Sequence, residues 1–179
     1  LEKARPDLYS TSMKLFKNIK KWLENQEHLF YLFLLILIVP NIILCFTEPM
    51  PVVAKVCNVL LPFAFYYLLM TLSRNCGKMF WILFLFIFFG AFQIVLLYLF
   101  GQSIIAVDMF LNLVTTNSSE ALELLDNLIP AIVIVVLLYI PALAVATVSV
   151  IKKRELPELF IHRERKRARL AMIAGVLSL

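Results

Sequence analysis

The chain has 179 residues, of which 62% are hydrophobic and only 16% are charged, and its formal net charge is +5. A composition this apolar cannot be buried inside one water-soluble domain, which excludes ordinary soluble enzymes and binding modules. We therefore expect an integral membrane protein. The basic excess does not indicate a nucleic-acid partner, because anionic membrane lipids attract the same charges.

Residues 1–28 form an N-terminal leader that mixes acidic and basic side chains before any apolar run. This pattern favours a cytoplasmic leader over a secretory signal peptide. Within it, basic and apolar residues alternate from Lys14 to Trp22 with helical spacing. Two interpretations stay open for this stretch, a short helix in the lipid headgroup region and an ordinary solvated tail.

Four apolar runs in the remaining residues, 29–179, are each long enough to cross a bilayer as a helix. They cover residues 29–46, 52–72, 80–100 and 128–151, and residues 170–179 begin a fifth run. We therefore predict an all-α, polytopic membrane helix bundle with four complete transmembrane helices and the start of a fifth. We expect the chain to be part of a longer protein.

Orientation follows from Lys and Arg, which resist translocation more strongly than acidic residues do. Basic residues occur before residue 29, between the second and third runs (Arg74 and Lys78), and from Lys152 to Arg169. The connections at residues 47–51 and 101–127 contain neither Lys nor Arg. The N-terminus is thus predicted to be cytoplasmic, and residues 101–127 are predicted to lie on the external side.

The long external connection carries a polar stripe at intervals of four residues: Asp108, Asn112, Thr116 and Glu120. On a helix these four side chains share one face. Apolar neighbours supply another face, which is typical of a helix lying at the membrane interface. An amide, a hydroxyl and a carboxylate on one stripe can bind a single polar ligand, so Asn112, Thr116 and Glu120 are candidate binding residues, with Asp108 a possible fourth.

A structural alternative stays open for Glu120, because Asn117 and Glu120 have the spacing of a capping box. In that interpretation Glu120 caps a short helix over residues 121–125. No catalytic motif is recognisable, and the three cysteines and two histidines lack metal-ligand spacing, so we expect no catalytic or metal residue within this chain.

The pattern Asn-x-x-x-Thr-Asn-x-x-Glu after the third span, here Asn112, Thr116, Asn117 and Glu120, resembles the membrane domain of bacterial phosphoethanolamine transferases. This family modifies lipid A and includes the colistin-resistance proteins. Its five-helix topology is similar to that predicted here. The resemblance implies that Asn112, Thr116 and Glu120 hold the phosphoethanolamine headgroup.

The resemblance also implies a bacterial inner-membrane enzyme whose residues 101–127 are periplasmic. Phosphatidylethanolamine is the implied donor, and lipid A or a related envelope glycan is the implied acceptor. A zinc-dependent periplasmic catalytic domain, carrying the nucleophilic threonine and the zinc ligands, is expected in cis beyond Leu179. The fragment alone is therefore expected to be inactive.

Two other functions remain open. The first is a related synthase that transfers glycerol phosphate, whose donor headgroup offers no ammonium to Glu120. The second is a small, non-enzymatic membrane scaffold subunit that docks a partner through the external connection.

Overall fold

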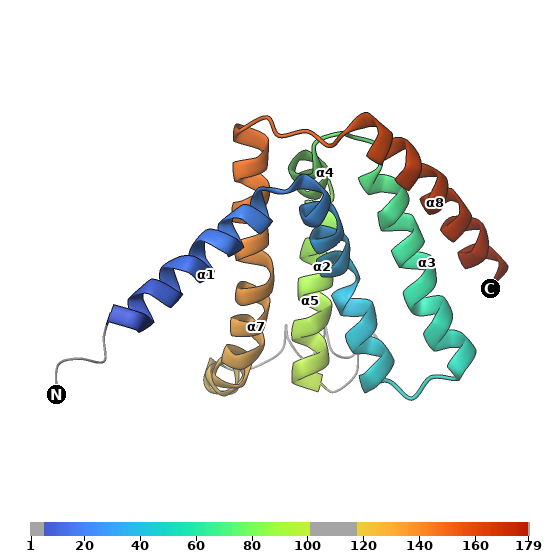
Figure 1. The fold of residues 1–179 in the computed structure, drawn as a ribbon. Helices are drawn as coiled ribbons and strands as arrows, with labels where there is room; N and C mark the ends of the chain where they lie inside the picture. The colour runs from blue at the N-terminus through green and yellow to red at the C-terminus, as the bar shows by residue number, and fades with distance from the viewer. Residues whose placement is uncertain (1–5, 101–117, 179) are drawn as a thin grey trace.

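The computed structural model describes residues 6–100 and 118–178, with side chains described for 13–15, 17–95 and 129–178. The regular elements in this part of the chain are all helices (Figure 1). They are α1 (Pro6–Glu24), α2 (Gln26–Thr47), α3 (Val52–Met70), α4 (Cys76–Ile82), α5 (Phe84–Phe100), α7 (Ser118–Ile151) and α8 (Glu158–Leu177). The all-α class predicted from the sequence is confirmed.

The N-terminal helix α1 leaves the bundle at an oblique angle (Figure 1). Its apolar side chains Leu15, Ile19 and Trp22 follow one another at three- and four-residue intervals and are all exposed. Such a stripe makes the helix amphipathic. The helical interpretation of residues 14–22 is confirmed, and a place in the headgroup region stays a prediction.

Two antiparallel helices, α2 and α3, match the first two predicted spans within a few residues. Both are long and apolar enough to cross a membrane. The side chain of Asn25 begins α2 by accepting a hydrogen bond from the backbone N–H of Glu27 at 2.9 Å. Two hydrogen bonds join the helices. The side-chain amide of Asn41 donates to the side-chain oxygen of Asn58 at 3.2 Å, and the side-chain amide of Asn58 donates to the backbone oxygen of Asn41 at 2.9 Å.

The third predicted span, 80–100, is not one straight helix. α4 begins earlier, at Cys76, and a bend of 62° separates it from α5. Leu83 at the bend is almost completely buried. This geometry lays α4 against α7, where Gly77 meets the backbone of Ala146. The bent pair counts as a fourth candidate span only if both helices cross the membrane together.

The helix α7 is longer than its predicted span, 128–151, because it begins at Ser118. The sequence places residues 118–127 in the external connection, and a short helix over 121–125 is the capping alternative for Glu120. In the structure residues 118–127 form one helix with the apolar segment Ile129–Ile151, which is the third continuous candidate span. The predicted four complete spans therefore correspond to three continuous helices and the bent pair.

The last helix, α8, combines a basic first half with the apolar run that begins at Leu170. It packs along α3. The described residues contain three candidate spans, or four with the bent pair, and α8 is not one of them. A fifth transmembrane helix beginning at residue 170 therefore stays a prediction.

The connections between the helices lie at two opposite ends of the bundle (Figure 1). At one of them the α1–α2 junction and the connections 71–75 and 152–157 meet, and we call this the basic end because Arg74 and residues 152–154 carry four positive charges. Much of the buried core lies near it, including Phe30, Met70 and Cys76. The opposite end carries the 48–51 connection, the end of α5 and the start of α7, which is the alternation that the sequence predicted.

Candidate functional site at the basic end

The residues singled out from the sequence lie largely outside the described part of the chain. Asp108, Asn112 and Thr116 fall in residues 101–117, and the side chain of Glu120 is likewise outside the description. The backbone of Glu120 is the third residue of α7. This position is compatible with both interpretations, since a helix N-terminus favours a carboxylate and leaves N–H groups to be capped.

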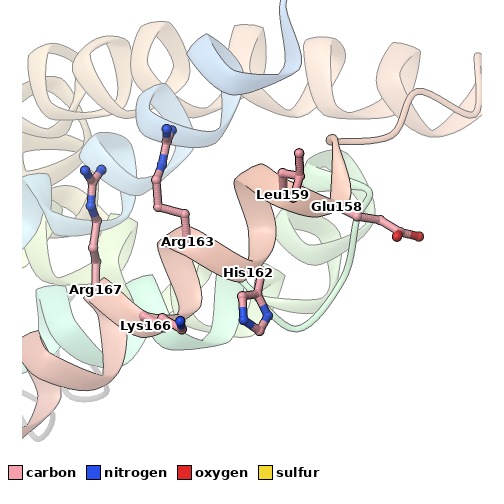
Figure 2. A pocket seen from close by; sticks show the side chains of 6 residues that line it. All are labelled: Glu158, Leu159, His162, Arg163, Lys166 and Arg167. Atoms are coloured by element: carbon pink, nitrogen blue, oxygen red, sulfur yellow. The ribbon is translucent and has the colours of Figure 1, made fainter.

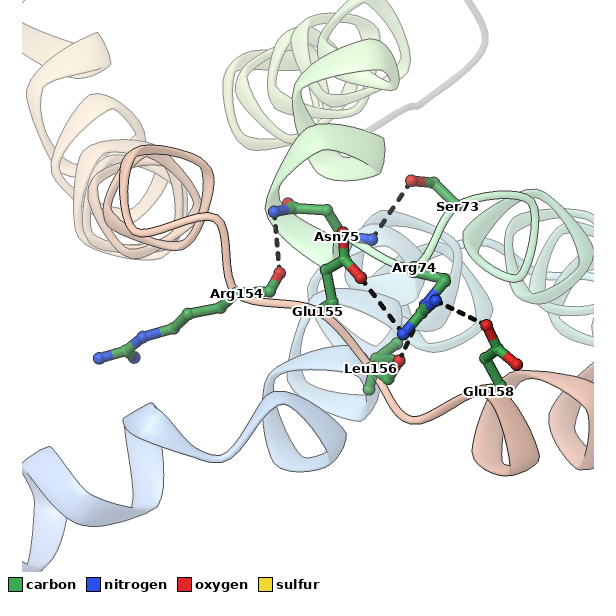
Figure 3. Close-up of polar contacts among 7 residues, drawn as sticks. All are labelled: Ser73, Arg74, Asn75, Arg154, Glu155, Leu156 and Glu158. Atoms are coloured by element: carbon green, nitrogen blue, oxygen red, sulfur yellow. Dashed lines mark hydrogen bonds and ion pairs between the residues drawn. The ribbon is translucent and has the colours of Figure 1, made fainter.

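At the basic end, the side chain of Asn75 forms a hydrogen bond with the connection between α7 and α8 (Figure 3). The Asn75 amide donates to the backbone oxygens of Ser149 at 3.3 Å and Arg154 at 2.9 Å. Its side-chain oxygen also accepts from the N–H of Lys78 at 2.8 Å, which caps α4. A single side chain therefore begins one helix and orders the end of another.

Arg74 binds the other half of the same connection (Figure 3). Its guanidinium lies 3.2 Å from Glu155 and 2.7 Å from Glu158, and its backbone oxygen accepts from the N–H of Leu156 at 2.8 Å. The three charged side chains are exposed, so the ion pairs contribute little to stability on their own. The buried Leu156 and the backbone bond hold the segment in place.

Glu164 in α8 is the one charged residue of the described chain whose side chain has no accessible surface, because Arg163 and Arg167 cover its carboxylate. Its carboxylate accepts a hydrogen bond from the Tyr67 hydroxyl in α3. Arg163 and Arg167 of α8 also donate to it, at 2.9 and 3.0 Å. Tyr31 of α2 is a further hydrogen-bond partner. The carboxylate thus joins three helices.

Burial alone would raise the pKa of the Glu164 carboxyl, because a low-dielectric site disfavours the charged form. The hydrogen bonds from Tyr67, Arg163 and Tyr31 outweigh that effect and hold the pKa below its ordinary value. Glu164 is therefore an anion with its acceptor positions occupied. Such a group fixes α8 to α2 and α3 and is a poor general base, since a base needs a free lone pair for the proton it removes.

The arginines held by Glu164 border a surface hollow of about 560 Å³. Figure 2 shows Arg163 and Arg167 on one side of α8 and His162 and Lys166 nearer the viewer. The lining residues are Glu158, Leu159, His162, Arg163, Lys166 and Arg167. Arg163 and Arg167 are paired with Glu164, so Lys166 is the lining cation that makes no ion pair within the described residues. Among the described residues, no group of three or more His, Cys, Asp or Glu is placed to hold a metal ion.

Sequence reasoning missed Glu164 as a structural centre, although a signal was present. Glu164 is the one acidic residue in the run His162 to Arg169, which otherwise contains five Lys and Arg. A lone carboxylate among cations is a candidate ion-pair centre. Its partner Tyr67 carried no such signal, because an aromatic residue in an apolar span is ordinary.

Comparison of the chain with protein-family models, curated proteins and solved structures finds no match.

Proposed function

We propose that this chain is the membrane domain of a transferase that moves phosphoethanolamine from phosphatidylethanolamine to lipid A or a related envelope glycan. The observation that carries the proposal is the stripe Asn112, Thr116 and Glu120, which in the sequence follows α5 and reaches into the first turn of α7. α5 ends and α7 begins at the end of the bundle opposite the basic end (Figure 1). The distribution of Lys and Arg favours the external side for that end. The resemblance to the transferase family implies that this side is the periplasm and that the membrane is the bacterial inner membrane.

The chemistry of the three side chains supports this ligand. Phosphoethanolamine pairs an ammonium with a phosphate, so the Glu120 carboxylate accepts charge-assisted hydrogen bonds from the ammonium. Asn112 and Thr116 can bond the phosphate or its ester oxygens. A glycerol phosphate headgroup lacks the ammonium and leaves Glu120 without a cationic partner, which favours phosphoethanolamine over that alternative.

In this proposal the described helices position the donor lipid, and another part of the enzyme carries out the transfer. The nucleophilic threonine and the zinc ligands belong to a catalytic domain in cis, beyond Leu179. The described residues do not form a zinc site of their own. The membrane domain therefore supplies donor binding and anchoring, and no step of the transfer is assigned to its side chains.

The test is mass spectrometry of lipid A and other envelope glycans from cells that express the intact protein. Glu120→Gln separates the two interpretations of Glu120, because glutamine also forms a capping box but carries no charge for the ammonium. We expect this variant to lower phosphoethanolamine transfer by about tenfold to a hundredfold, the effect of losing one charged hydrogen bond. Glu123→Gln, one turn further along α7, is the matched control and should transfer normally.

Equal transfer by wild type and Glu120→Gln would assign Glu120 to helix capping alone. Absence of added phosphoethanolamine from every envelope glycan of wild-type cells, at confirmed membrane expression, would remove the phosphoethanolamine transferase proposal and leave the glycerol phosphate synthase and the scaffold subunit.

A further inference from the structure

A second hollow at the basic end lies between α1 and α7, away from the site on α8. Its volume is about 430 Å³, within the range of small-ligand sites. Figure 1 shows α1 diverging from α7 in this region. The hollow combines an apolar floor with a cationic rim.

The floor consists of side chains from both helices, including Leu23 of α1 and Val145 and Val148 of α7. Val145 and Val148 belong to the candidate span Ile129–Ile151 and lie within roughly 10 Å of its end, at 1.5 Å per residue. Val148 remains 43% exposed although it is apolar. This part of the hollow is therefore at the depth of lipid hydrocarbon when α7 crosses a membrane.

The rim carries three cations, Lys20 of α1 and Lys152 and Arg154 after α7. Glu24 neutralises one of them, because its carboxylate lies 3.3 Å from the Arg154 guanidinium. Lys20 and Lys152 make no ion pair within the described residues, so two positive charges stay unpaired there. Lys152 directly follows the last residue of α7, which places its ammonium at headgroup level.

We propose that this hollow binds one anionic glycerophospholipid from the leaflet at the basic end. The phosphate lies between Lys20 and Lys152, and an acyl chain follows Val148 and Val145 along α7. The charge and the hydrocarbon of this ligand lie at the same depths as the matching parts of the site. Its phosphate is at the depth of Lys152, and its acyl chain is at the depth of Val145. Basic pockets beside membrane helices bind lipid headgroups in this way.

The site is independent of the proposed transferase activity, since it lies at the other end of the bundle from the start of α7. Its occupant is anionic, whereas the proposed donor at the opposite end is zwitterionic. Binding of the lipid would tie the amphipathic helix α1 to α7, and so fix the orientation of the leader at the membrane surface.

The test measures phosphatidylglycerol and phosphatidylcholine binding to the purified chain by native mass spectrometry, with each lipid titrated in detergent. We expect wild type to retain one phosphatidylglycerol at concentrations at which phosphatidylcholine is lost. The double variant Lys20→Gln/Lys152→Gln should bind phosphatidylglycerol about thirtyfold more weakly, from a loss of about fivefold for each lysine near the headgroups. Lys20→Arg/Lys152→Arg should restore binding.

The matched control is Lys14→Gln/Lys78→Gln, which removes the same charge from α1 and α4 outside the hollow. It should bind as wild type does. An equal loss in both glutamine double variants would show diffuse attraction to basic charge and overturn the site. Equal retention of the two lipids by wild type would overturn it as well. Val148→Trp, which fills the floor and keeps every charge, should also weaken binding if the acyl chain occupies it.

Discussion

The hydroxyl of Tyr67 in α3 donates a hydrogen bond to the buried carboxylate of Glu164 in α8, 97 positions later in the chain. Thr71, one turn after Tyr67, reinforces the contact because its backbone oxygen accepts from the Arg165 guanidinium at 2.7 Å. Two adjacent residues of α8 are thus bonded to the last turn of α3 and to the residue that ends it. Glu164, the buried acidic residue of α8, therefore holds the basic half of this helix against α3.

Replacing Glu164 with Ala should destabilise the fold by about 3 kcal/mol, because it leaves the Tyr67 hydroxyl buried without its acceptor and removes the partner of two arginines. Unfolding in detergent, followed by circular dichroism, measures the change. Glu158→Ala is the control, since Glu158 is exposed and pairs with Arg74 at the surface. It should cost less than about 1 kcal/mol. Equal costs for the two variants would contradict a structural role for Glu164.

The same carboxylate predicts how stability depends on pH. The pKa of Glu164 is lowered in the folded state, so the native protein binds fewer protons there than the unfolded chain does. Its contribution is therefore complete above the unfolded glutamate pKa, about 4.3, and is lost as the pH falls through the lower, folded value.

Unfolding free energies of wild type and Glu164→Gln should consequently differ by a constant amount from pH 7 to about pH 5 and converge at more acidic pH. Comparing the two proteins at each pH removes the titration of all other groups. A difference that grows on acidification would show that the folded pKa is raised.

The sequence predicted the helices better than the contacts between them. Apolar runs locate α2, α3 and the membrane part of α7, because hydrophobic length is a local property. The Tyr67–Glu164 contact depends on the relative tilt of α3 and α8, which hydropathy does not encode. The bend at Leu83 is also unmarked, since neither Pro nor Gly lies at that position. The candidate stripe at Asn112, Thr116 and Glu120 stays a prediction.

The close approach of α4 to α7 at Gly77 leads to a further prediction. A Cβ atom added at Gly77 would overlap the backbone oxygen of Ala146 and lie 3.0 Å from the Cβ of Ser149. Small residues allow membrane helices to approach this closely. Gly77→Ala should therefore destabilise the fold by about 1–3 kcal/mol, measured by unfolding in detergent.

Gly175→Ala is the internal control, because the nearest atom to its new Cβ lies at 3.4 Å, an ordinary contact. Alanine is the better helix former, so this change should be neutral or stabilise α8 by up to about 1 kcal/mol. A neutral Gly77→Ala would mean that α4 and α7 are less closely packed than the structure has them.

Orientation in the membrane follows from the two ends of the bundle. Leu72 is exposed beside Arg74 at the basic end, whereas Val53 is exposed at the start of α3, at the opposite end. Because Lys and Arg resist translocation, we expect Leu72 inside and Val53 outside. In a chain whose three cysteines are replaced, a membrane-impermeant thiol reagent should label Val53→Cys in spheroplasts and Leu72→Cys only after permeabilisation.

The reverse labelling pattern would place the basic end outside, and the transferase proposal would fail. The start of α7 would then face the cytoplasm, away from an external acceptor, whereas the anionic-lipid site at Lys20 and Lys152 would only change leaflet. Labelling of both positions before permeabilisation would instead indicate that α3 does not cross the membrane. The two single substitutions therefore test the orientation on which the transferase proposal depends, and they assign the leaflet that supplies the anionic lipid.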